Sequence, residues 1–215
     1  MKMKKIVLLG DSIRMGYDKY VKEALDGVAE VYYPSDNCSF SQHILRFAHE
    51  WKEKGNWPDD VDLVHWNAGL WDAAEICGDA PISSYSYYKE AIERIDRRMR
   101  LLFPTAKIVF ATSTPVIERE NCVFTRHNSI IEEFNRVALE ALSCTDTVIN
   151  DLYSLAASFP TEYHSDWVHY YTPEGTEALG GKVLSVICSE LDIKASEVNI
   201  ENFEPEKYSA DNIGF

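Results

Sequence analysis

Three residues from the two ends of the chain have the side-chain types that a serine hydrolase needs. Ser12 closes the segment 5–12, in which an apolar run stops at Gly-Asp-Ser. Asp166 and His169 stand three positions apart near the other end. A hydroxyl group is a poor nucleophile at neutral pH, so it needs a base, and the base needs an orienting carboxylate. The order of these residues along the chain is compatible with this chemistry, because geometry and not sequence order defines a catalytic triad.

Each of these residues has a simpler interpretation as well. Gly-Asp-Ser also makes ordinary turns, and Asp11 or Ser12 could serve only as a helix cap. His164, Asp166 and His169 could instead form a metal site, because histidine and aspartate at short spacing can bind zinc. No further ligand is evident in the sequence, so we favour the serine hydrolase and keep the metal-dependent hydrolase as an alternative.

Apolar runs that alternate with helical patterns predict the elements that must position these residues. Five runs are typical of strands that are covered on both faces. They are residues 6–9, 29–33, 61–66, 108–112 and 147–149. Apolar residues at three- and four-residue steps predict helices over 88–102, 130–142 and 178–191. Thr172 can cap the last of these helices, and Pro173 suits its first turn.

The alternation of strands and helices predicts an α/β fold with a parallel sheet and helices on both faces. Sites in such sheets form at the carboxyl ends of the strands. Ser12 follows the first predicted strand, and the segment 67–72 follows the third. We therefore expect both to lie at the same edge of the sheet.

Length and composition predict one domain followed by a short tail. Of the 215 residues, 46% are hydrophobic, which is enough for one sizeable core. We assign residues 1–192 to this domain. Residues 193–215, where the periodicity fades, are assigned to an acidic C-terminal tail. The net charge of −14 argues against nucleic acid and anionic membrane surfaces as partners, because both are polyanions.

The sequence favours a cytoplasmic protein. The apolar run before Asp11 is shorter than the about 7–15 residues of a secretory signal. No stretch approaches the roughly 18 apolar residues that span a bilayer. The cysteines are odd in number, scattered and without a Cys-x-x-Cys pair, which indicates reduced thiols rather than disulfides, zinc or a redox motif. They are Cys38, Cys77, Cys122, Cys144 and Cys188.

The two end motifs together resemble those of the SGNH, or GDSL-type, esterases and acylhydrolases. The first motif is Gly-Asp-Ser-Ile at 10–13, and the last is Asp-Trp-Val-His at 166–169, which continues through Thr-Pro-Glu-Gly at 172–175. The resemblance runs from about Lys5 to Leu191, nearly the whole chain. It implies a flavodoxin-like three-layer α/β/α sandwich with a five-stranded parallel sheet.

The resemblance also implies a function. Ser12 would be the nucleophile of an ester hydrolysis, His169 its base and Asp166 the partner of the base, with no cofactor and no metal. The expected partner is a small-molecule ester with a short acyl group, such as acetyl on a sugar.

The middle motifs depart from the family pattern, in which a glycine N–H and an asparagine amide help to hold the oxyanion. The loop 36–41 has no glycine, although a backbone N–H of Ser39 or Cys38 could still serve. Trp71 stands at the position of the asparagine, and Asn67 lies four residues before it. Two interpretations remain open: Asn67 supplies the amide from a shifted position, or this donor is absent or replaced. We predict an oxyanion hole built from Ser12, Ser39 and Asn67.

Three further residues are candidates for contact with the substrate. Arg14 follows the nucleophile and could hold a substrate carboxylate or hydroxyl group, although such an arginine more often pairs with a nearby acid. Trp71 and Trp167 could offer flat faces to an acyl group or a sugar, although both could equally pack in the core. The altered middle motifs leave one rival of another class, a binding domain that keeps the fold but has lost catalytic rate.

Overall fold

The computed structural model describes residues 2–120 and 122–200 and centres on a parallel sheet of five strands. The strand order is β2-β1-β3-β5-β7, which is the order of flavodoxin-like sheets. Their bounds are β1 (Lys4–Leu9), β2 (Ala29–Tyr32), β3 (Leu63–Trp66), β5 (Lys107–Ala111) and β7 (Val148–Asn150). The five predicted strands are therefore confirmed, each close to its predicted position.

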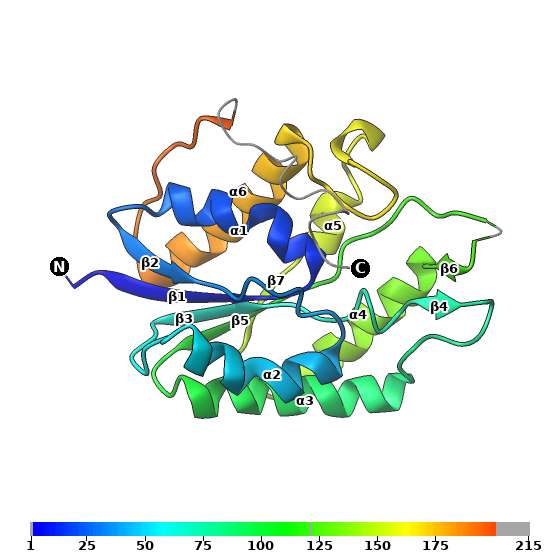
Figure 1. Ribbon diagram of the computed structural model, residues 1–215, viewed down its shortest axis with the longest axis horizontal. Helices are drawn as coiled ribbons and strands as arrows, with labels where there is room; N and C mark the ends of the chain where they lie inside the picture. Colours follow the sequence, from blue (N-terminus) through cyan, green and yellow to red (C-terminus); the bar gives the residue numbers. More distant parts are fainter. Residues whose placement is uncertain (1, 121, 201–215) are drawn as a thin grey trace.

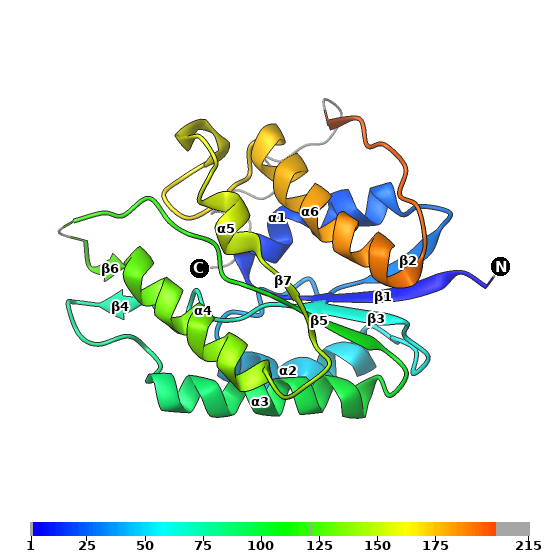
Figure 2. The same cartoon turned by 180° about the vertical axis from the view of Figure 1, so that it is seen from behind.

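Helices cover both faces of this sheet, which confirms the predicted three-layer sandwich. Figures 1 and 2 show α1, α5 and α6 on one face and α2, α3 and α4 on the other. Their bounds are α1 (Ser12–Ala24), α2 (Ser41–Lys54), α3 (Tyr85–Leu102), α4 (Asn128–Leu142), α5 (Leu152–Ala156) and α6 (Pro173–Leu191). A short 3₁₀ helix, Thr161–Tyr163, precedes the loop that holds Asp166 and His169. As predicted, Thr172 caps α6, and its hydroxyl accepts a hydrogen bond from the Gly175 N–H.

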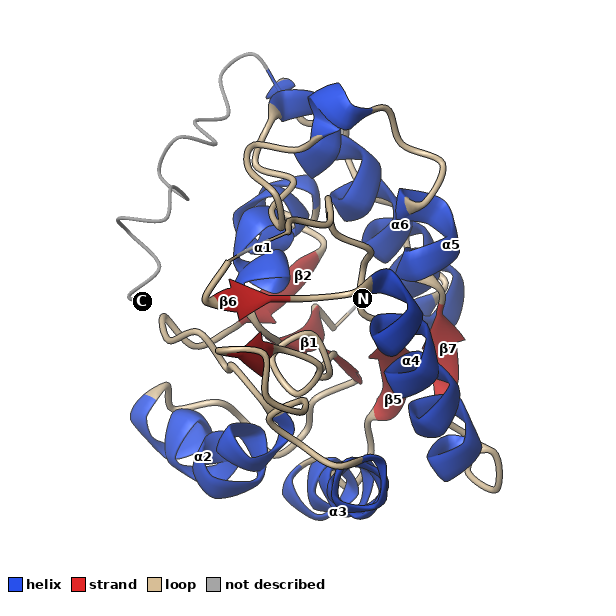
Figure 3. Cartoon of the chain, turned by 90° about the vertical axis from the view of Figure 1, so that its right-hand side faces the viewer, coloured by secondary structure: helices blue, strands red, loops and turns tan. Residues whose placement is uncertain are grey.

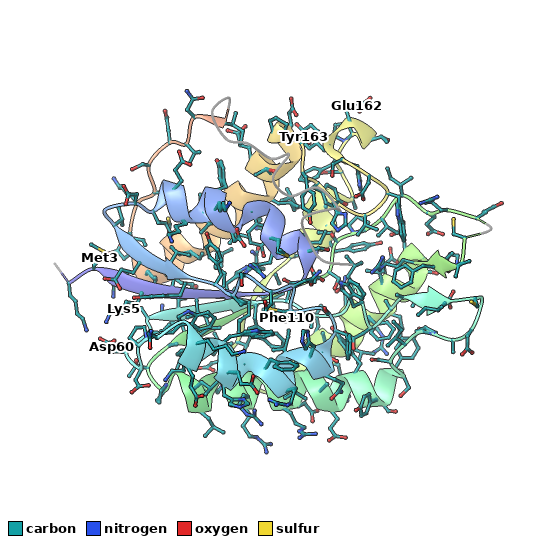
Figure 4. All side chains as sticks on the ribbon, viewed as in Figure 1. Met3, Lys5, Asp60, Phe110, Glu162 and Tyr163 are labelled. Atoms are coloured by element: carbon teal, nitrogen blue, oxygen red, sulfur yellow. The ribbon has the colours of Figure 1, made fainter. Side chains whose placement is uncertain are left out.

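The core lies between these layers, because the central strands are apolar on both faces. Residues 6–9 of β1 and 63–66 of β3 are wholly buried. Phe110 of β5 lies in the interior against Trp66, with ring centroids 4.8 Å apart (Figure 4). His65 is buried among these apolar residues, and burial lowers its pKa to about 3, so it is neutral in the folded protein.

A small second sheet was not predicted from the sequence. Strands β4 (Glu75–Ile76) and β6 (Phe124–Thr125) pair antiparallel, each over two residues. This pair, labelled in Figure 1, joins the segment after β3 to the segment after β5, and Figure 3 shows β6 from another side. The polypeptide thus folds over the carboxyl end of the main sheet, where the predicted site residues gather.

The beginning of the predicted tail packs against the domain. The Ser196 N–H donates to the Ala24 carbonyl at 2.8 Å, and Ile193, Val198 and Ile200 lie against the core. Residues 201–215 of the predicted tail lie outside the described residues. Within residues 2–120 and 122–200, no helix has the length and apolar character needed to cross a membrane.

Candidate active site

Ser12 stands where the first strand of the sheet turns into the first helix. Strand β1 ends at Leu9, and Asp11 caps α1 because its Oδ1 accepts the Ile13 N–H at 2.9 Å. Ser12 is therefore the first residue of α1, where a helix leaves its backbone N–H groups without intrahelical partners. Its side chain is almost fully buried, with 2% of the residue exposed. The strand-to-helix turn thus fixes the serine hydroxyl and a backbone N–H at one point.

The turn requires glycine at position 10 because two elements approach each other closely there. A Cβ on Gly10 would lie 1.9 Å from Asn67 Oδ1 and 2.8 Å from Arg14 Cβ. Asn67 follows the neighbouring strand β3, and its N–H donates to the Leu9 carbonyl at 3.1 Å. The order of the sheet puts its switch point between β1 and β3, where flavodoxin-like sheets form their sites. Both Ser12 and segment 67–72 lie at this edge, as predicted.

A continuous chain of hydrogen bonds joins Asp166, His169 and Ser12. His169 Nε2 lies 2.8 Å from Ser12 Oγ, although the two residues are 157 positions apart. On the other side of the ring, His169 Nδ1 lies 2.7 Å from Asp166 Oδ2. The structure thus brings together the three residues that the sequence singled out, at the separations that proton transfer requires.

The surroundings of Asp166 keep its carboxylate ionised. Its Oδ1 accepts the N–H groups of Val168 at 2.7 Å and His169 at 2.8 Å, while its Oδ2 faces the His169 ring. Burial alone would raise the pKa of Asp166, but the hydrogen bonds and charge of His169 outweigh it and lower the pKa to about 2. An ionised carboxylate can only accept hydrogen bonds, so Nδ1 carries the ring proton. His169 Nε2 is then the acceptor for the Ser12 hydroxyl.

Tyr171 holds the serine and the histidine in this arrangement. Its ring stacks on His169, with centroids 4.6 Å apart and an interplanar angle of 20°. Its hydroxyl donates to the Ser12 carbonyl at 2.7 Å. One tyrosine therefore restrains both the His169 ring and the start of the helix that carries Ser12.

The alternative metal site finds no support in the geometry. The His164 ring packs on Tyr170, with centroids 4.1 Å apart, and burial lowers the pKa of His164. Asp166 is already the acceptor for two backbone N–H groups and for His169. Across residues 2–120 and 122–200, no three histidine, cysteine or acidic side chains converge as metal ligands.

An open cleft of about 240 Å³ leads to Ser12. Polar, aromatic and aliphatic residues from three separate segments line it. They are Ser12, Phe124, Arg126, Asp166, Trp167, Val168 and His169.

Arg14 does not contribute to this cleft, which corrects its predicted role in substrate binding. It is almost fully buried and pairs with Asp18 at 2.6 Å. Its guanidinium also donates to the backbone carbonyls of Gly10, Pro34 and Asp36. These bonds engage all its N–H groups, so Arg14 ties the turn before Ser12 to the loop after β2.

The predicted oxyanion donors other than Ser12 face different partners in this structure. The Ser39 N–H donates to Asn37 Oδ1 at 2.9 Å, and the Cys38 N–H donates to the Gly10 carbonyl at 3.1 Å. The Asn67 side chain is buried against Gly10 and is not among the residues that line the cleft. Their predicted roles therefore stay predictions, to be tested by substitution.

The two predicted tryptophans differ in their placement. Trp167 lines the cleft beside Asp166, and its predicted contact with substrate stays a prediction. Trp71 is not among the residues that line the cleft, and its ring meets Phe124 edge-on with centroids 6.1 Å apart. Its predicted contact with substrate stays a prediction.

Arg126 lines the cleft and was not predicted from the sequence. It follows β6, and its Nε donates to the Leu70 carbonyl at 2.6 Å. No recognisable motif surrounds it in the sequence, where it is one arginine in an irregular segment. It reaches the cleft only because β6 pairs with β4, a contact that leaves no periodic pattern.

Comparison with known proteins identifies the fold. No protein-family model and no curated protein matches the sequence. Solved structures do match, among them a lipase/acylhydrolase from Enterococcus faecalis, with 21% identity and a TM-score of 0.67 over 91% of this chain and 100% of that chain.

Two further solved structures agree with this match. A carbohydrate esterase family 3 protein from Talaromyces cellulolyticus has 19% identity and a TM-score of 0.64, over 89% of this chain and 100% of that chain. A protein from Slackia heliotrinireducens, described provisionally as an SGNH hydrolase, has 14% identity and a TM-score of 0.65, over 86% and 100%. The chain therefore has the SGNH hydrolase fold that its end motifs implied.

Proposed function

We propose that this protein is a serine esterase that hydrolyses a short-acyl ester of a carbohydrate or another small molecule. The observation that carries the proposal is the hydrogen-bonded chain from Asp166 through His169 to Ser12, at 2.7 and 2.8 Å, beside an open cleft. The fold is shared with a lipase/acylhydrolase and a carbohydrate esterase. The fold alone does not define a reaction, so the proposal depends on the site.

The proposed reaction proceeds in two steps. His169 Nε2 takes the proton of the Ser12 hydroxyl while Ser12 Oγ bonds to the ester carbonyl carbon, and the carbonyl electrons move to its oxygen. When the carbonyl reforms, the alcohol leaves with the proton from His169, and an acyl group remains on Ser12. Water then attacks the acyl-enzyme by the same route, which releases the acid and restores the serine.

The dimensions and lining of the cleft support a small substrate. A space of about 240 Å³ accommodates an acetyl group and part of an alcohol. Trp167 and Phe124 present aromatic surface at the cleft, which suits the apolar face of a sugar ring. Acetyl esters are therefore proposed as better substrates than long-chain esters.

A panel of p-nitrophenyl esters and acetylated sugars tests this function. We expect turnover to be highest for acetyl esters and to fall with acyl length. Ser12→Ala should lose at least about 10³-fold in kcat, because the nucleophile is removed. Ser143→Ala, which changes an exposed hydroxyl after α4, serves as the matched control and should retain parental turnover. Ester hydrolysis that persists in Ser12→Ala would show that another group is the nucleophile.

A further inference from the structure

Arg126 places a buried positive charge on the wall of the cleft that holds Ser12. Only 3% of the residue is exposed, and it lines the cleft together with Ser12 and His169. Its Nε donates to the Leu70 carbonyl at 2.6 Å, which fixes the plane of the guanidinium. A cation this deeply buried is costly unless something offsets its charge, so its surroundings indicate its role.

Within the described part of the chain, no carboxylate forms an ion pair with Arg126. Among the described residues, the single hydrogen bond of Arg126 is the one that its Nε donates to the Leu70 carbonyl. Burial lowers the pKa of Arg126 to about 10, against the longer-range attraction of Asp11 and Asp166. The side chain is still charged at neutral pH, and its charge is not matched by a neighbouring acid.

Aromatic rings surround the guanidinium instead. Its central carbon lies 4.7 Å from the ring centroid of Phe124, 5.6 Å from that of Trp71 and 5.5 Å from that of Trp167. Cation–π contacts of this kind stabilise a desolvated cation but accept none of its hydrogen bonds. With Nε held by Leu70, the N–H groups on the two Nη atoms are left for an acceptor that enters the cleft.

An ester hydrolysis creates such an acceptor beside Ser12. The tetrahedral intermediate carries a negative oxygen that needs preorganised donors. The Ser12 N–H is available at the start of α1. The N–H groups of Cys38 and Ser39 donate to other acceptors, and the Asn67 side chain lies outside the cleft lining.

We propose that the Arg126 guanidinium donates a hydrogen bond to this oxyanion and supplies the side-chain donor of the oxyanion hole. The inference rests on the proposed esterase function. No proton moves from Arg126 in this step: the carbonyl electrons localise on oxygen as Ser12 Oγ bonds to carbon, and they return as the alcohol leaves. Arg126 stabilises the charge only while it exists, so its contribution lies in the transition state.

The test is the hydrolysis of p-nitrophenyl acetate, a neutral ester, by Arg126 variants. Arg126→Ala should lower kcat by about 10²–10³ and leave KM within a few-fold, because one oxyanion donor is lost. Arg126→Lys should recover part of the loss, since it keeps the charge without the planar fork.

Arg119→Ala is the matched control. Arg119 also lies over the Trp167 ring, 5.5 Å from its centroid, but it is exposed and does not line the cleft. Its turnover should stay within a few-fold of the parent.

Chemical rescue separates this role from a structural one. Guanidinium ion added to Arg126→Ala should restore part of kcat, and an equal concentration of ammonium or sodium ion should restore less. Circular dichroism and thermal unfolding show whether each variant is folded. If Arg126→Ala unfolds, the comparison of Arg126→Lys with the parent decides the question.

Two outcomes overturn the proposal. One is a folded Arg126→Ala protein with parental kcat on the neutral ester. The other is a variant in which kcat is unchanged and KM is raised, and only for esters that carry a carboxylate or phosphate. That result would show that Arg126 recognises an anionic substrate. A parent protein that hydrolyses esters, and a Ser12→Ala protein that does not, keep the proposed function intact in either case.

Discussion

The ionisation of Asp166 determines what His169 can do for Ser12. Asp166 uses one oxygen to accept two backbone N–H groups and the other to face His169 Nδ1. Oδ1 stabilises the conformation of the loop, and Oδ2 determines the tautomer of the His169 ring. Removing the charge from this carboxyl should therefore affect catalysis more than folding.

Asp166→Asn tests this division. The asparagine oxygen can keep accepting the N–H groups of Val168 and His169, whereas its NH₂ group replaces the acceptor that faces Nδ1. The ring then favours the tautomer with the proton on Nε2, which cannot accept from Ser12. We expect kcat to fall by about 10³–10⁴. The melting temperature at neutral pH should fall only moderately, because the stabilisation by the carboxylate is lost while the backbone hydrogen bonds are kept. Parental turnover in a folded Asp166→Asn protein would contradict the assigned role.

The pH dependence follows from the same residue. Because the pKa of Asp166 is lowered to about 2, it stays ionised throughout the working range. The acid limb of kcat/KM should then be a single titration, that of the base, with no contribution from the Asp166 carboxyl. A second acid limb at about pH 4, the usual value of a carboxyl, would show that Asp166 is not held ionised.

Stability should respond to pH in the direction set by this shift. The pKa of Asp166 in the folded protein is lower than the value of about 3.9 for an unfolded chain. The carboxylate therefore stabilises the folded state at pH values above about 4, and this contribution is lost as the pH falls toward 2. Thermal unfolding of the parent and of Asp166→Asn should converge at low pH.

At the scale of elements, the junction between β1 and α1 fixes the position of Ser12. Five strands could be predicted because their apolar runs reflect burial on both faces, as in residues 6–9 and 63–66. The β4–β6 pair could not, because two-residue strands have no period and depend on tertiary contact. Arg126 was missed for this reason, since β6 brings it to the cleft.

Gly10→Ala probes the junction. The new Cβ would lie 1.9 Å from Asn67 Oδ1, inside a buried site, so the turn must shift. We expect a loss of about 1–3 kcal/mol in the free energy of unfolding and a marked fall in kcat. In the control, Gly181→Ala, a Cβ on α6 meets no neighbouring atom within 4 Å. The control should gain about 0.5–1 kcal/mol from helix propensity. Equal behaviour of the two variants in chemical denaturation and turnover would contradict the tight junction.

At the scale of the whole molecule, the fold brings residues from both ends of the chain to one point. Helices α1 and α6 lie side by side on the same face of the sheet (Figures 1 and 2), so Ser12 at the start of α1 meets the loop just before α6. The two end motifs predicted that these residues lie close together, because a serine nucleophile needs a base and the base needs a carboxylate. The bonds from Arg14 to the Pro34 and Asp36 carbonyls were not predictable, since the loop after β2 reaches Arg14 only in the folded chain.

The stoichiometric reaction of Ser12 with an organophosphonate tests the central claim most directly. Only an activated serine hydroxyl reacts quickly with such a reagent, so activation is measured without knowledge of the substrate. We predict one adduct per chain by intact mass, mapped to Ser12 by peptide analysis, and a much slower reaction in His169→Ala. An unlabelled parent protein, or an adduct that forms equally fast in Ser12→Ala, would contradict the account.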